Sequence, residues 1–252
     1  MYKERQEKIV AIIEARMTST RLPDKVLLPL AGKPALARLI ERLQRSQYLD
    51  DICVATTTND TDEPIVALAH ELGTNCFRGS EQDVLGRVLG AARASGADVI
   101  IEITGDCPLA DHRVVDRGIE TFFMKNVDYV SNGLSPSYPG GFDVQIFSVA
   151  VLAEVDGLTQ DPVDRVHVSY YIYQHPERYR LYNFVAPPEA FAPQLRVTLD
   201  EENDYTVIAK VFETLHPRNP DFSAEDVVAF LTSHPDIAVL NTSVRQKLPH
   251  EL

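Results

Sequence analysis

The sequence has 252 residues, of which 44% are hydrophobic, and its 24 Lys and Arg against 37 Asp and Glu give a formal net charge of −13. This acidic balance excludes a general nucleic-acid binder, because an acidic surface repels the phosphate backbone. No apolar run reaches the length of a membrane span and residues 1–8 are charged, so we expect neither a signal peptide nor a membrane anchor.

The chain begins with an apolar run at 9–13, whose length and β-branched residues predict a buried strand. The following loop carries Arg16, Arg21 and Lys25 among small hydroxyl residues, all of which can donate to phosphate oxygens. Residues 1–45 hold ten basic residues and only five acidic ones. A basic loop on an acidic protein predicts a site for a small phosphorylated ligand, and the alternative is a solvated connection. The dinucleotide and P-loop fingerprints are absent.

Strands and helices then alternate as far as residue 123, which predicts an α/β fold. We expect helices at 34–46, 64–72 and 111–123, a helix that begins at Ser80, and strands at 51–56, 75–77 and 98–104. Polar residues follow these strands at the edge where open α/β sheets bind ligands, namely Thr57 and the segment 78–87. Both could equally serve as helix caps.

The strand at 98–104 leads to Gly105 and Asp106. A carboxylate at this edge, beside a glycine that admits a ligand, is well placed to bind Mg²⁺. A lone Asp in a loop is more often a helix cap, and Asp111 is the candidate for capping the helix at 111–123.

From residue 128 the alternation breaks. Strands are predicted at 128–132, 142–147 and 178–185 and a helix at 163–175, which together suggest an inserted subregion at 128–190. The loop at 135–141 is rich in Pro and Gly, so it is either a ligand-facing loop or an ordinary turn. The tyrosines of this subregion suit internal packing or a subunit contact, and we expect a homodimer built through it.

A returning strand is predicted at 195–199, followed by Asp200 and by helices at 201–215 and 223–233. Asp200 is either the N-cap of the first of these helices or a second metal carboxylate. If the strands before Asp106 and Asp200 are neighbours, the two carboxylates converge and repel each other unless a cation lies between them. We expect the tail from Asn241 to be loosely held. Cys53, Cys76 and Cys107 match no zinc pattern and indicate buried thiols in a reducing cytoplasm.

The run ARMTSTRLPDKVL at 15–27, followed by AGKP at 31–34, resembles the signature of the CTP-dependent sugar nucleotidyltransferases. That family includes the acylneuraminate and 3-deoxy-manno-octulosonate cytidylyltransferases, and the nearest branch is the spore-coat-polysaccharide cytidylyltransferase-like proteins. The similarity extends through Asp200. Relatives have V-D-T-P/E-x-D there, whereas this chain has T-L-D-E-E-N-D, so Asp200 matches less well than Asp106.

The resemblance implies a single domain over 1–252 with a Rossmann-like three-layer α/β/α nucleotidyltransferase fold. It implies transfer of CMP from CTP to a sugar acid or sugar phosphate, with Mg²⁺, in a cytoplasmic homodimer that makes activated sugars for surface polysaccharide. The implied catalytic residues are Arg16, Arg21, Lys25 and Asp106, and the implied metal ligands are Asp106 and Asp200. The implied nucleotide-binding residues are Ala15, Arg16, Met17, Ser19, Thr20, Arg21, Lys25, Thr57, Ser80, Asp83, Arg87 and Gly105. The implied acceptor-binding residues are Tyr138, Asp143, Arg165 and His167.

Three other functions fit part of the pattern. Guanylyl transfer would need different base contacts in the segment 80–87. Glycosyl transfer from a nucleotide sugar also uses a metal carboxylate, but a diphosphate sugar needs fewer cationic contacts than a triphosphate. A non-catalytic nucleotide-binding regulator would have no need for both Asp106 and Asp200. A hydroxyl acceptor and a phosphate acceptor both remain compatible with the sequence.

Overall fold

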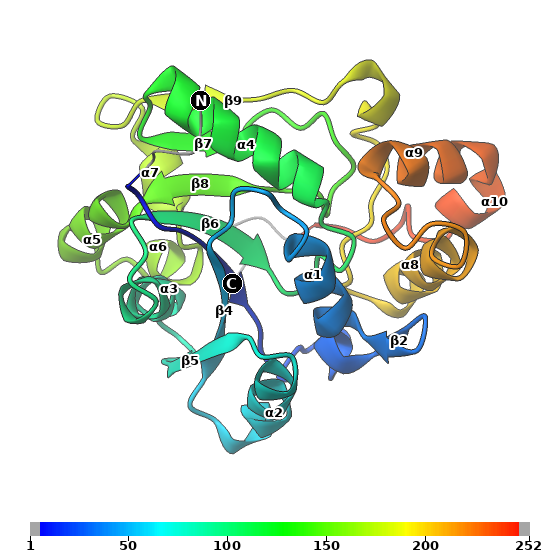
Figure 1. Ribbon diagram of the computed structural model, residues 1–252, viewed down its shortest axis with the longest axis horizontal. Helices are drawn as coiled ribbons and strands as arrows, with labels where there is room; N and C mark the ends of the chain where they lie inside the picture. The colour runs from blue at the N-terminus through cyan, green and yellow to red at the C-terminus, as the bar shows by residue number, and fades with distance from the viewer. Residues whose placement is uncertain (1–5, 247–252) are drawn as a thin grey trace.

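The apolar run of β1 lies at the centre of a seven-stranded mixed sheet, in a computed structural model that describes residues 6–246 (Figure 1). The strands are β1 Ile9–Glu14, β4 Asp51–Thr57, β5 Asn75–Gly79, β6 Val99–Thr104, β7 Tyr129–Ser131, β8 Gln145–Ser148 and β9 Leu181–Asn183. Their order is β5-β4-β1-β6-β8-β7-β9. The first four are mutually parallel, whereas β8 is antiparallel to β6 and to β7. Both faces of β1 are buried, one in each core, which is why it is a continuous apolar run.

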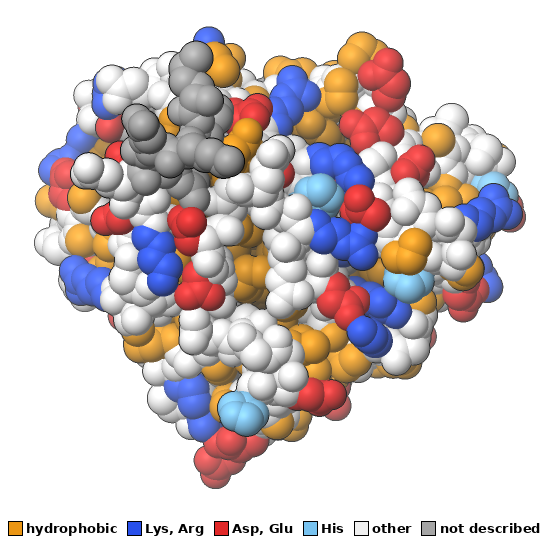
Figure 2. Space-filling view, viewed as in Figure 1, with side chains coloured by type: hydrophobic (Ala, Val, Ile, Leu, Met, Phe, Trp, Pro, Cys, Tyr) orange, Lys and Arg blue, Asp and Glu red, His pale blue; other side chains and the backbone are white. Residues whose placement is uncertain are grey.

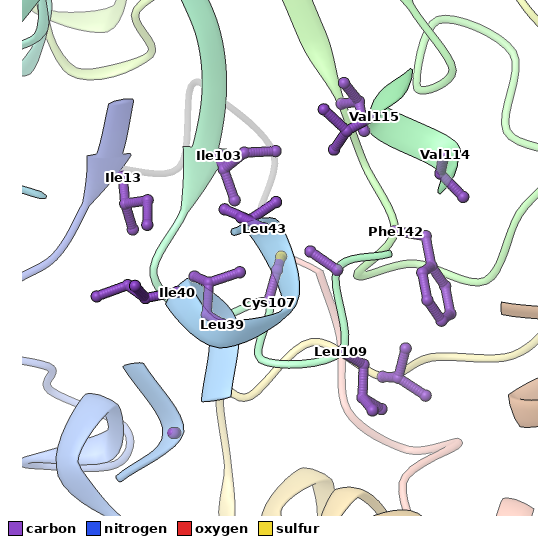
Figure 3. Close-up of a cluster of buried hydrophobic side chains, with 14 of the residues drawn as sticks. Ile13, Leu39, Ile40, Leu43, Ile103, Cys107, Leu109, Val114, Val115 and Phe142 are labelled. Carbon is purple, nitrogen blue, oxygen red and sulfur yellow. The ribbon is translucent and has the colours of Figure 1, made fainter. Parts of the chain in front are cut away.

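Helices cover both faces of the sheet. The helices are α1 Ala35–Leu43, α2 Glu63–Glu71, α3 Val84–Ala94, α4 His112–Lys125, α5 Val149–Leu158, α6 Pro162–Val166, α7 Tyr170–Gln174, α8 Glu202–Leu215, α9 Ala224–Ser233 and α10 Pro235–Ala238. Side chains of α1, α2, α4, α8 and α9 form one core, and side chains of α3, α5 and α7 form the other. Figure 3 shows Leu39, Ile40 and Leu43 of α1 turned toward Ile13 and Ile103 of the sheet. The predicted three-layer nucleotidyltransferase fold is confirmed.

Sheet residues of β1 alternate between the two cores. Ile9, Ala11 and Ile13 belong to the core with α1, whereas Val10 and Ile12 belong to the core with α3. This alternation follows from the twofold period of a strand. The same alternation places Glu14, at the C-terminal end of β1, on the α3 side of the sheet.

Several predicted elements differ from the structure in the second half of the chain. The strand predicted at 195–199 is wrong: the segment is extended but has only an isolated bridge between Gly140 and Arg196, because its backbone groups bond to loops. The helix predicted at 163–175 is two short helices, interrupted between Val166 and Tyr170. Helix α5 was not predicted, since its apolar residues carry no helical stripe. The helix predicted to begin at Ser80 begins at Val84, with Asp83 as its cap.

The tail is also better held than expected within the described residues. Asn241 is buried and donates to the carbonyl oxygen of Arg196 and to Asp204 Oδ1. Residues 1–5 of the charged N-terminal stretch and residues 247–252 of the expected loose tail lie outside the described residues.

A small hairpin lies between the basic loop and α1. It consists of β2 Pro29–Leu30 and β3 Lys33–Pro34, joined by Ala31 and Gly32 with φ angles of 47° and 82°. Two successive positive φ angles define a type I′ turn, and Ala31 is strained in that conformation.

The surface has no single-sign region on the face drawn in Figure 2, where acidic and basic side chains alternate. Between residues 6 and 246, no helix is long and apolar enough to cross a membrane.

Candidate active site

A cavity of about 720 Å³ lies at the C-terminal ends of β1 and β6. This is the edge at which open α/β sheets bind ligands. The basic loop after β1, helix α3 and helix α6 all contribute to the lining of the cavity. Its lining includes Glu14, Ala15, Arg16, Ser19, Thr20, Arg21, Lys25, Val26, Glu81, Gln82, Val84, Arg87, Thr104, Gly105, Asp106, Pro162, Val166, His167 and Asp200.

Lys25 joins the two carboxylates that the sequence singled out. Its Nζ lies 2.9 Å from Asp106 Oδ2 and 2.9 Å from Asp200 Oδ1. Burial opposes the charge of the ammonium group, but the two carboxylates outweigh burial and raise the pKa of Lys25. Two carboxylates that converge from distant parts of the chain therefore hold a cation between them.

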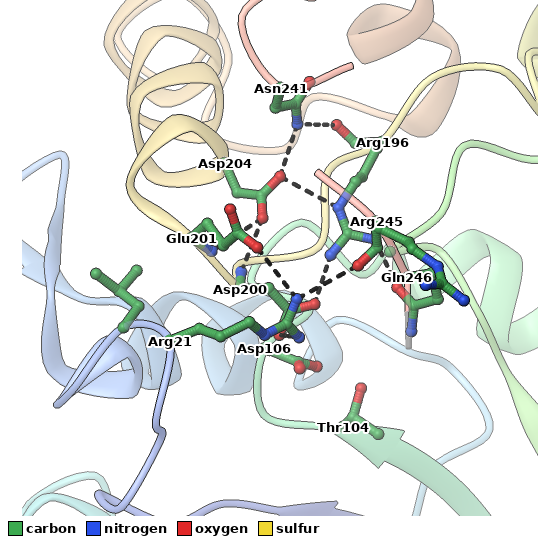
Figure 4. Close-up of polar contacts among 12 residues, drawn as sticks. Arg21, Thr104, Asp106, Arg196, Asp200, Glu201, Asp204, Asn241, Arg245 and Gln246 are labelled. Atoms are coloured by element: carbon green, nitrogen blue, oxygen red, sulfur yellow. Dashed lines mark hydrogen bonds and ion pairs between the residues drawn. The ribbon is translucent and has the colours of Figure 1, made fainter. Parts of the chain in front are cut away.

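Asp200 is surrounded by further cations. Arg21 Nη2 lies 2.9 Å from Asp200 Oδ1, and Arg196 Nη2 donates to Asp200 Oδ2 (Figure 4). Burial raises the pKa of Asp200, but Lys25, Arg21 and Arg196 lower it below its usual value. Asp200 is thus ionised at neutral pH, as a metal ligand must be.

Asp200 is not the helix cap that the sequence also allowed. The N-cap of α8 is Glu201, which forms a capping box with Asp204. Asp204 Oδ2 accepts from the backbone N–H groups of Asp200 and Glu201 at 3.1 and 3.0 Å. The cap is supplied by its neighbours, so the Asp200 carboxylate is directed into the cavity.

Arg16 lies at the other end of the basic loop. Its Nη1 lies 3.1 Å from Glu81 Oε1, which also accepts from Thr18, while Glu81 Oε2 accepts from Asn59. These hydrogen bonds from Thr18 and Asn59, with Arg16, lower the pKa of Glu81. Arg16, Arg21 and Lys25 are thus each paired with a carboxylate.

A close backbone contact brings β1 and β6 together beneath the cavity. Gly105 N donates to the carbonyl oxygen of Glu14 at 2.7 Å, and a Cβ at Gly105 would lie 2.7 Å from that oxygen. Only glycine allows this approach. Gly105 therefore sets the position of Asp106 relative to the loop that begins at Ala15.

Two expected nucleotide-binding residues stabilise the loop from below. Met17 N donates to Asp62 Oδ1 at 2.8 Å, and Thr57 donates to Asp62 Oδ2 through both its N–H and its hydroxyl. Thr57 and Asp62 are fully buried, and Met17 is 9% exposed. The structure therefore places Met17 and Thr57 behind the cavity lining.

The segment 80–87 is divided between two positions. Arg87 lines the cavity and donates to the carbonyl oxygen of Ser80 at 2.5 Å. Asp83 caps α3 through Gly86 N and accepts a bidentate contact from Arg165 at 2.8 and 2.6 Å. Ser80 Oγ accepts from Asp83 N. The structure places Ser80 and Asp83 in the support of the α3 N-terminus, outside the lining.

Of the four expected acceptor-binding residues, the structure brings His167 to the cavity. Arg165 is held by Asp83 and by Asp156, whose Oδ1 lies 2.8 Å from its Nη1. Tyr138 is buried, and its hydroxyl accepts from Arg117 at 3.4 Å. Asp143 Oδ2 accepts from Gly141 N at 2.9 Å.

Sequence reasoning missed a pair of acids under the cavity. Glu14 lines the cavity, and Glu102 is 5% exposed one strand away. Charged residues within the apolar runs IVAIIE and VIIEIT were the available signal. Thr104, Pro162 and Val166 were also missed, because small and apolar lining residues carry no distinctive pattern.

The donor set fits a divalent ion that uses few protein ligands. Residues 6–246 contain no group of three or more His, Cys, Asp or Glu side chains arranged to hold a metal. Mg²⁺ is commonly bound by one or two carboxylates together with substrate phosphates. Asp106 and Asp200, which already share one cation, match that pattern.

Comparison with known proteins agrees with this geometry. A family model described as Cytidylyltransferase matches residues 10–216. The spore coat polysaccharide biosynthesis protein SpsF of Bacillus subtilis is 35% identical over 91% of this chain and 96% of its own length. The 3-deoxy-manno-octulosonate cytidylyltransferase of Trichlorobacter lovleyi is 30% identical over 85% of this chain and 95% of its own. A solved cytidylyltransferase from Leptospira borgpetersenii is 28% identical, with a TM-score of 0.86 over 96% of this chain and 99% of that chain.

Proposed function

This chain belongs to the cytidylyltransferase family, and from that premise we propose that it transfers CMP from CTP to a sugar acid with release of pyrophosphate. The observation that carries the proposal is the position of Lys25, whose Nζ lies 2.9 Å from both Asp106 and Asp200 at the end of a basic loop. A triphosphate and a divalent cation need cationic groups and carboxylates side by side, and this site supplies both.

The basic loop would bind the triphosphate. Arg16, Arg21 and Lys25 are paired with carboxylates, so the phosphates of CTP would replace Glu81, Asp106 and Asp200 as their partners. The same three side chains would stabilise the charge that develops on the leaving pyrophosphate. Ser19 and Thr20 supply hydroxyl donors along the same wall. Nucleotidyl transfer depends mainly on such positioning and charge neutralisation.

We propose Asp106 and Asp200 as the ligands of Mg²⁺. When CTP takes Lys25, the two carboxylates lose the cation that separates them and can accept a divalent one. Mg²⁺ bound there would act as a Lewis acid toward the phosphate oxygens. Arg196 holds the second oxygen of Asp200, so this carboxylate keeps its orientation during the exchange.

The acceptor class is proposed from the relatives. One is named for 3-deoxy-manno-octulosonate, which is a sugar acid, and another for spore coat polysaccharide biosynthesis. We therefore propose a sugar acid as the acceptor and an activated sugar for a surface polysaccharide as the product. Guanylyl transfer is the competing hypothesis, because few base contacts separate the two reactions.

A pyrophosphate-release assay tests the proposal. The protein is incubated with Mg²⁺ and each of the four nucleoside triphosphates, with a panel of sugar acids and sugar 1-phosphates as acceptors. We expect release with CTP and at least one sugar acid. Release with GTP alone would favour guanylyl transfer, and release only with sugar 1-phosphates would contradict the sugar-acid acceptor.

A further inference from the structure

Glu14 and Glu102 form a buried acid pair on the face of the sheet that α3 covers. The register aligns Ile12 with Glu102 and Glu14 with Thr104 on the neighbouring parallel strands β1 and β6. Both glutamates thus point to the same side, two residues apart along the strands. The two carboxyl groups lie close enough for each to shift the pKa of the other.

A hydrogen bond between them would require a proton, because two carboxylates have no hydrogen to share. Glu14 Oε1 and Glu102 Oε2 are both buried, and no N–H or O–H group of residues 6–246 donates to either. Glu102 is the deeper of the two, at 5% exposed, and it lies beside Ser169 and the buried hydroxyl of Tyr129. Glu102 is therefore the member that keeps the proton.

Glu14 is the member that reaches the ligand. It lines the cavity together with Asp106, Val166 and His167. The charged groups around it are Arg87 of α3, Arg16 of the loop, Asp106 and Glu102. If the buried oxygen of Glu14 shares the proton of Glu102, the other carboxylate oxygen is available to the cavity.

We propose that Glu14 is the general base that accepts the proton of an attacking acceptor hydroxyl, and that Glu102 is a positioning residue that holds Glu14 through the shared proton. The inference rests on the proposed function and deepens it, because it assigns the acceptor atom to a hydroxyl. A phosphate acceptor is already an anion, needs no base, and would be repelled by Glu14.

The reaction balances without a further reactant. The acceptor oxygen forms a bond to the α-phosphorus of CTP as its proton passes to the free oxygen of Glu14. The bond between the α-phosphorus and the bridging oxygen breaks, and pyrophosphate leaves with that electron pair. Glu14 later returns the proton to solvent.

The environment of Glu14 suits this role at neutral pH. Burial raises the pKa of Glu14 to about 7, although Arg87 and the hydrogen bond from Glu102 both lower it. Burial and the neighbouring Glu14 raise the pKa of Glu102 well above its usual value. A general base is most effective when its pKa lies near the working pH.

The test measures kcat for pyrophosphate release from CTP with 3-deoxy-manno-octulosonate from about pH 5 to about pH 9. Glu14→Gln should lower kcat by roughly 100-fold or more and abolish the acidic limb of the profile. CTP affinity by calorimetry should change by less than about threefold. Glu71→Gln, on the exposed face of α2, is the matched control and should behave as wild type. An unchanged kcat and acidic limb in Glu14→Gln would overturn the proposal.

Glu102 supplies a second test should Glu14→Gln fold poorly. Glu102→Leu removes the hydrogen bond that stabilises the Glu14 carboxylate, so the acidic limb should move to higher pH. Glu102→Gln keeps a hydrogen-bond donor at this position and should move the acidic limb less than Glu102→Leu does. An acidic limb that stays in place in Glu102→Leu would contradict the role of Glu102.

An infrared titration of the carboxyl C=O band, taken as wild type minus Glu14→Gln, needs no acceptor. Glu14 should titrate near neutral pH, and a Glu14 that remains ionised down to about pH 5 would overturn the assignment. A wild-type protein that is inactive with every sugar acid would instead contradict the proposed function. The infrared titration would still test the acid pair in that case.

Discussion

The backbone N–H of Leu199 donates a 2.7 Å hydrogen bond to the carbonyl oxygen of Asp106. This single contact joins the loop after β6 to the extended segment before α8. It brings Asp200 next to Asp106 although Asp200 follows no strand of the sheet. The two proposed metal ligands are therefore positioned by a loop-to-loop bond, and the strand pairing expected from the sequence is not needed.

Removing a cation from the loop should weaken nucleotide binding without unfolding the protein. Lys25→Ala and Arg21→Ala each delete a charge-assisted contact to phosphate, which should cost about 1.5–3 kcal/mol of CTP binding free energy. Lys33→Ala, in the hairpin outside the cavity, is the control and should leave affinity unchanged. Calorimetric titration with CTP gives the comparison. Wild-type affinity in both loop variants would identify the loop as a solvated connection.

Asp106→Asn should abolish turnover while preserving most of the affinity for CTP, since the basic loop still holds the triphosphate. Asp200→Asn should act in the same way and also lower stability, because Asp200 is 5% exposed and pairs with Arg21, Lys25 and Arg196. The measurements are kcat and the CTP dissociation constant across a Mg²⁺ titration. Asp236→Asn, exposed on α10, is the control. Wild-type kcat in Asp106→Asn at low Mg²⁺ would place the metal elsewhere.

Asp62 should give the protein an acid-sensitive component of stability. Burial raises the pKa of Asp62, but hydrogen bonds from Thr57, Met17 and Thr56 outweigh it and lower the pKa below its usual value. The stabilisation is therefore complete above the unfolded-state pKa of about 3.9 and is lost as the pH falls through the folded-state pKa.

The variant Asp62→Asn tests this component. It leaves buried donors without an acceptor and should cost about 1–3 kcal/mol of unfolding free energy at neutral pH. Urea unfolding of wild type and variant at neutral and acid pH should show the difference shrinking in acid. Asp60 is exposed, so Asp60→Asn is the control, and its unfolding free energy should equal that of wild type at either pH. A difference in unfolding free energy between wild type and Asp62→Asn that is constant with pH would contradict the assigned role of Asp62.

Ala31→Asn should stabilise the protein. Ala31 has a φ angle of 47° at the first position of the β2–β3 turn, where Asn is tolerated much better than Ala. Relief of the left-handed strain is worth roughly 1 kcal/mol. Ala94→Asn, in the right-handed last turn of α3, should instead lose a few tenths of a kcal/mol, by roughly the helix propensity difference. Thermal or urea unfolding measures the change in stability for each substitution. Changes of the same sign for Ala31→Asn and Ala94→Asn would contradict this prediction.

We also predict a homodimer through the subregion from about 128 to 190. Four partly exposed tyrosines gather there, Tyr170, Tyr171, Tyr173 and Tyr182, whereas Tyr179 is buried within the subunit. Tyrosine is enriched where a ring is buried and its hydroxyl stays paired. Light scattering that gave a particle of 28.1 kDa at micromolar concentration would exclude this dimer.

The sequence predicts the first half of this fold well because periodicity and burial coincide there. Strands β1, β4 and β6 are largely apolar runs in the interior of the sheet, so their pattern alone identifies them. The basic loop was equally visible, since its charge contrasts with that of the whole chain. The local residue pattern was sufficient to predict an element wherever that element is determined by its own residues.

The rest depended on contacts between distant segments, which leave no local pattern. Segment 195–199 has the composition of a strand but bonds to loops. The ion pairs of Arg165 with Asp83 and Asp156 follow from how α6 meets α3 and α5. The pairing of Glu14 with Glu102 could have been inferred from two charges in buried strands, once the strand order was known.

The hydrogen bonds of Asn241 have a consequence for the order in which the chain is synthesised. Lys25 and Asp106 emerge from the ribosome early, but Asp200 is oriented through Arg196 and Asp204, which Asn241 contacts. The nascent chain can form β1, β4, β5 and β6 while translation continues, because their pairing is complete by Thr104. Until Asn241 has left the ribosome, the newborn protein would have a sheet without the finished carboxylate pair.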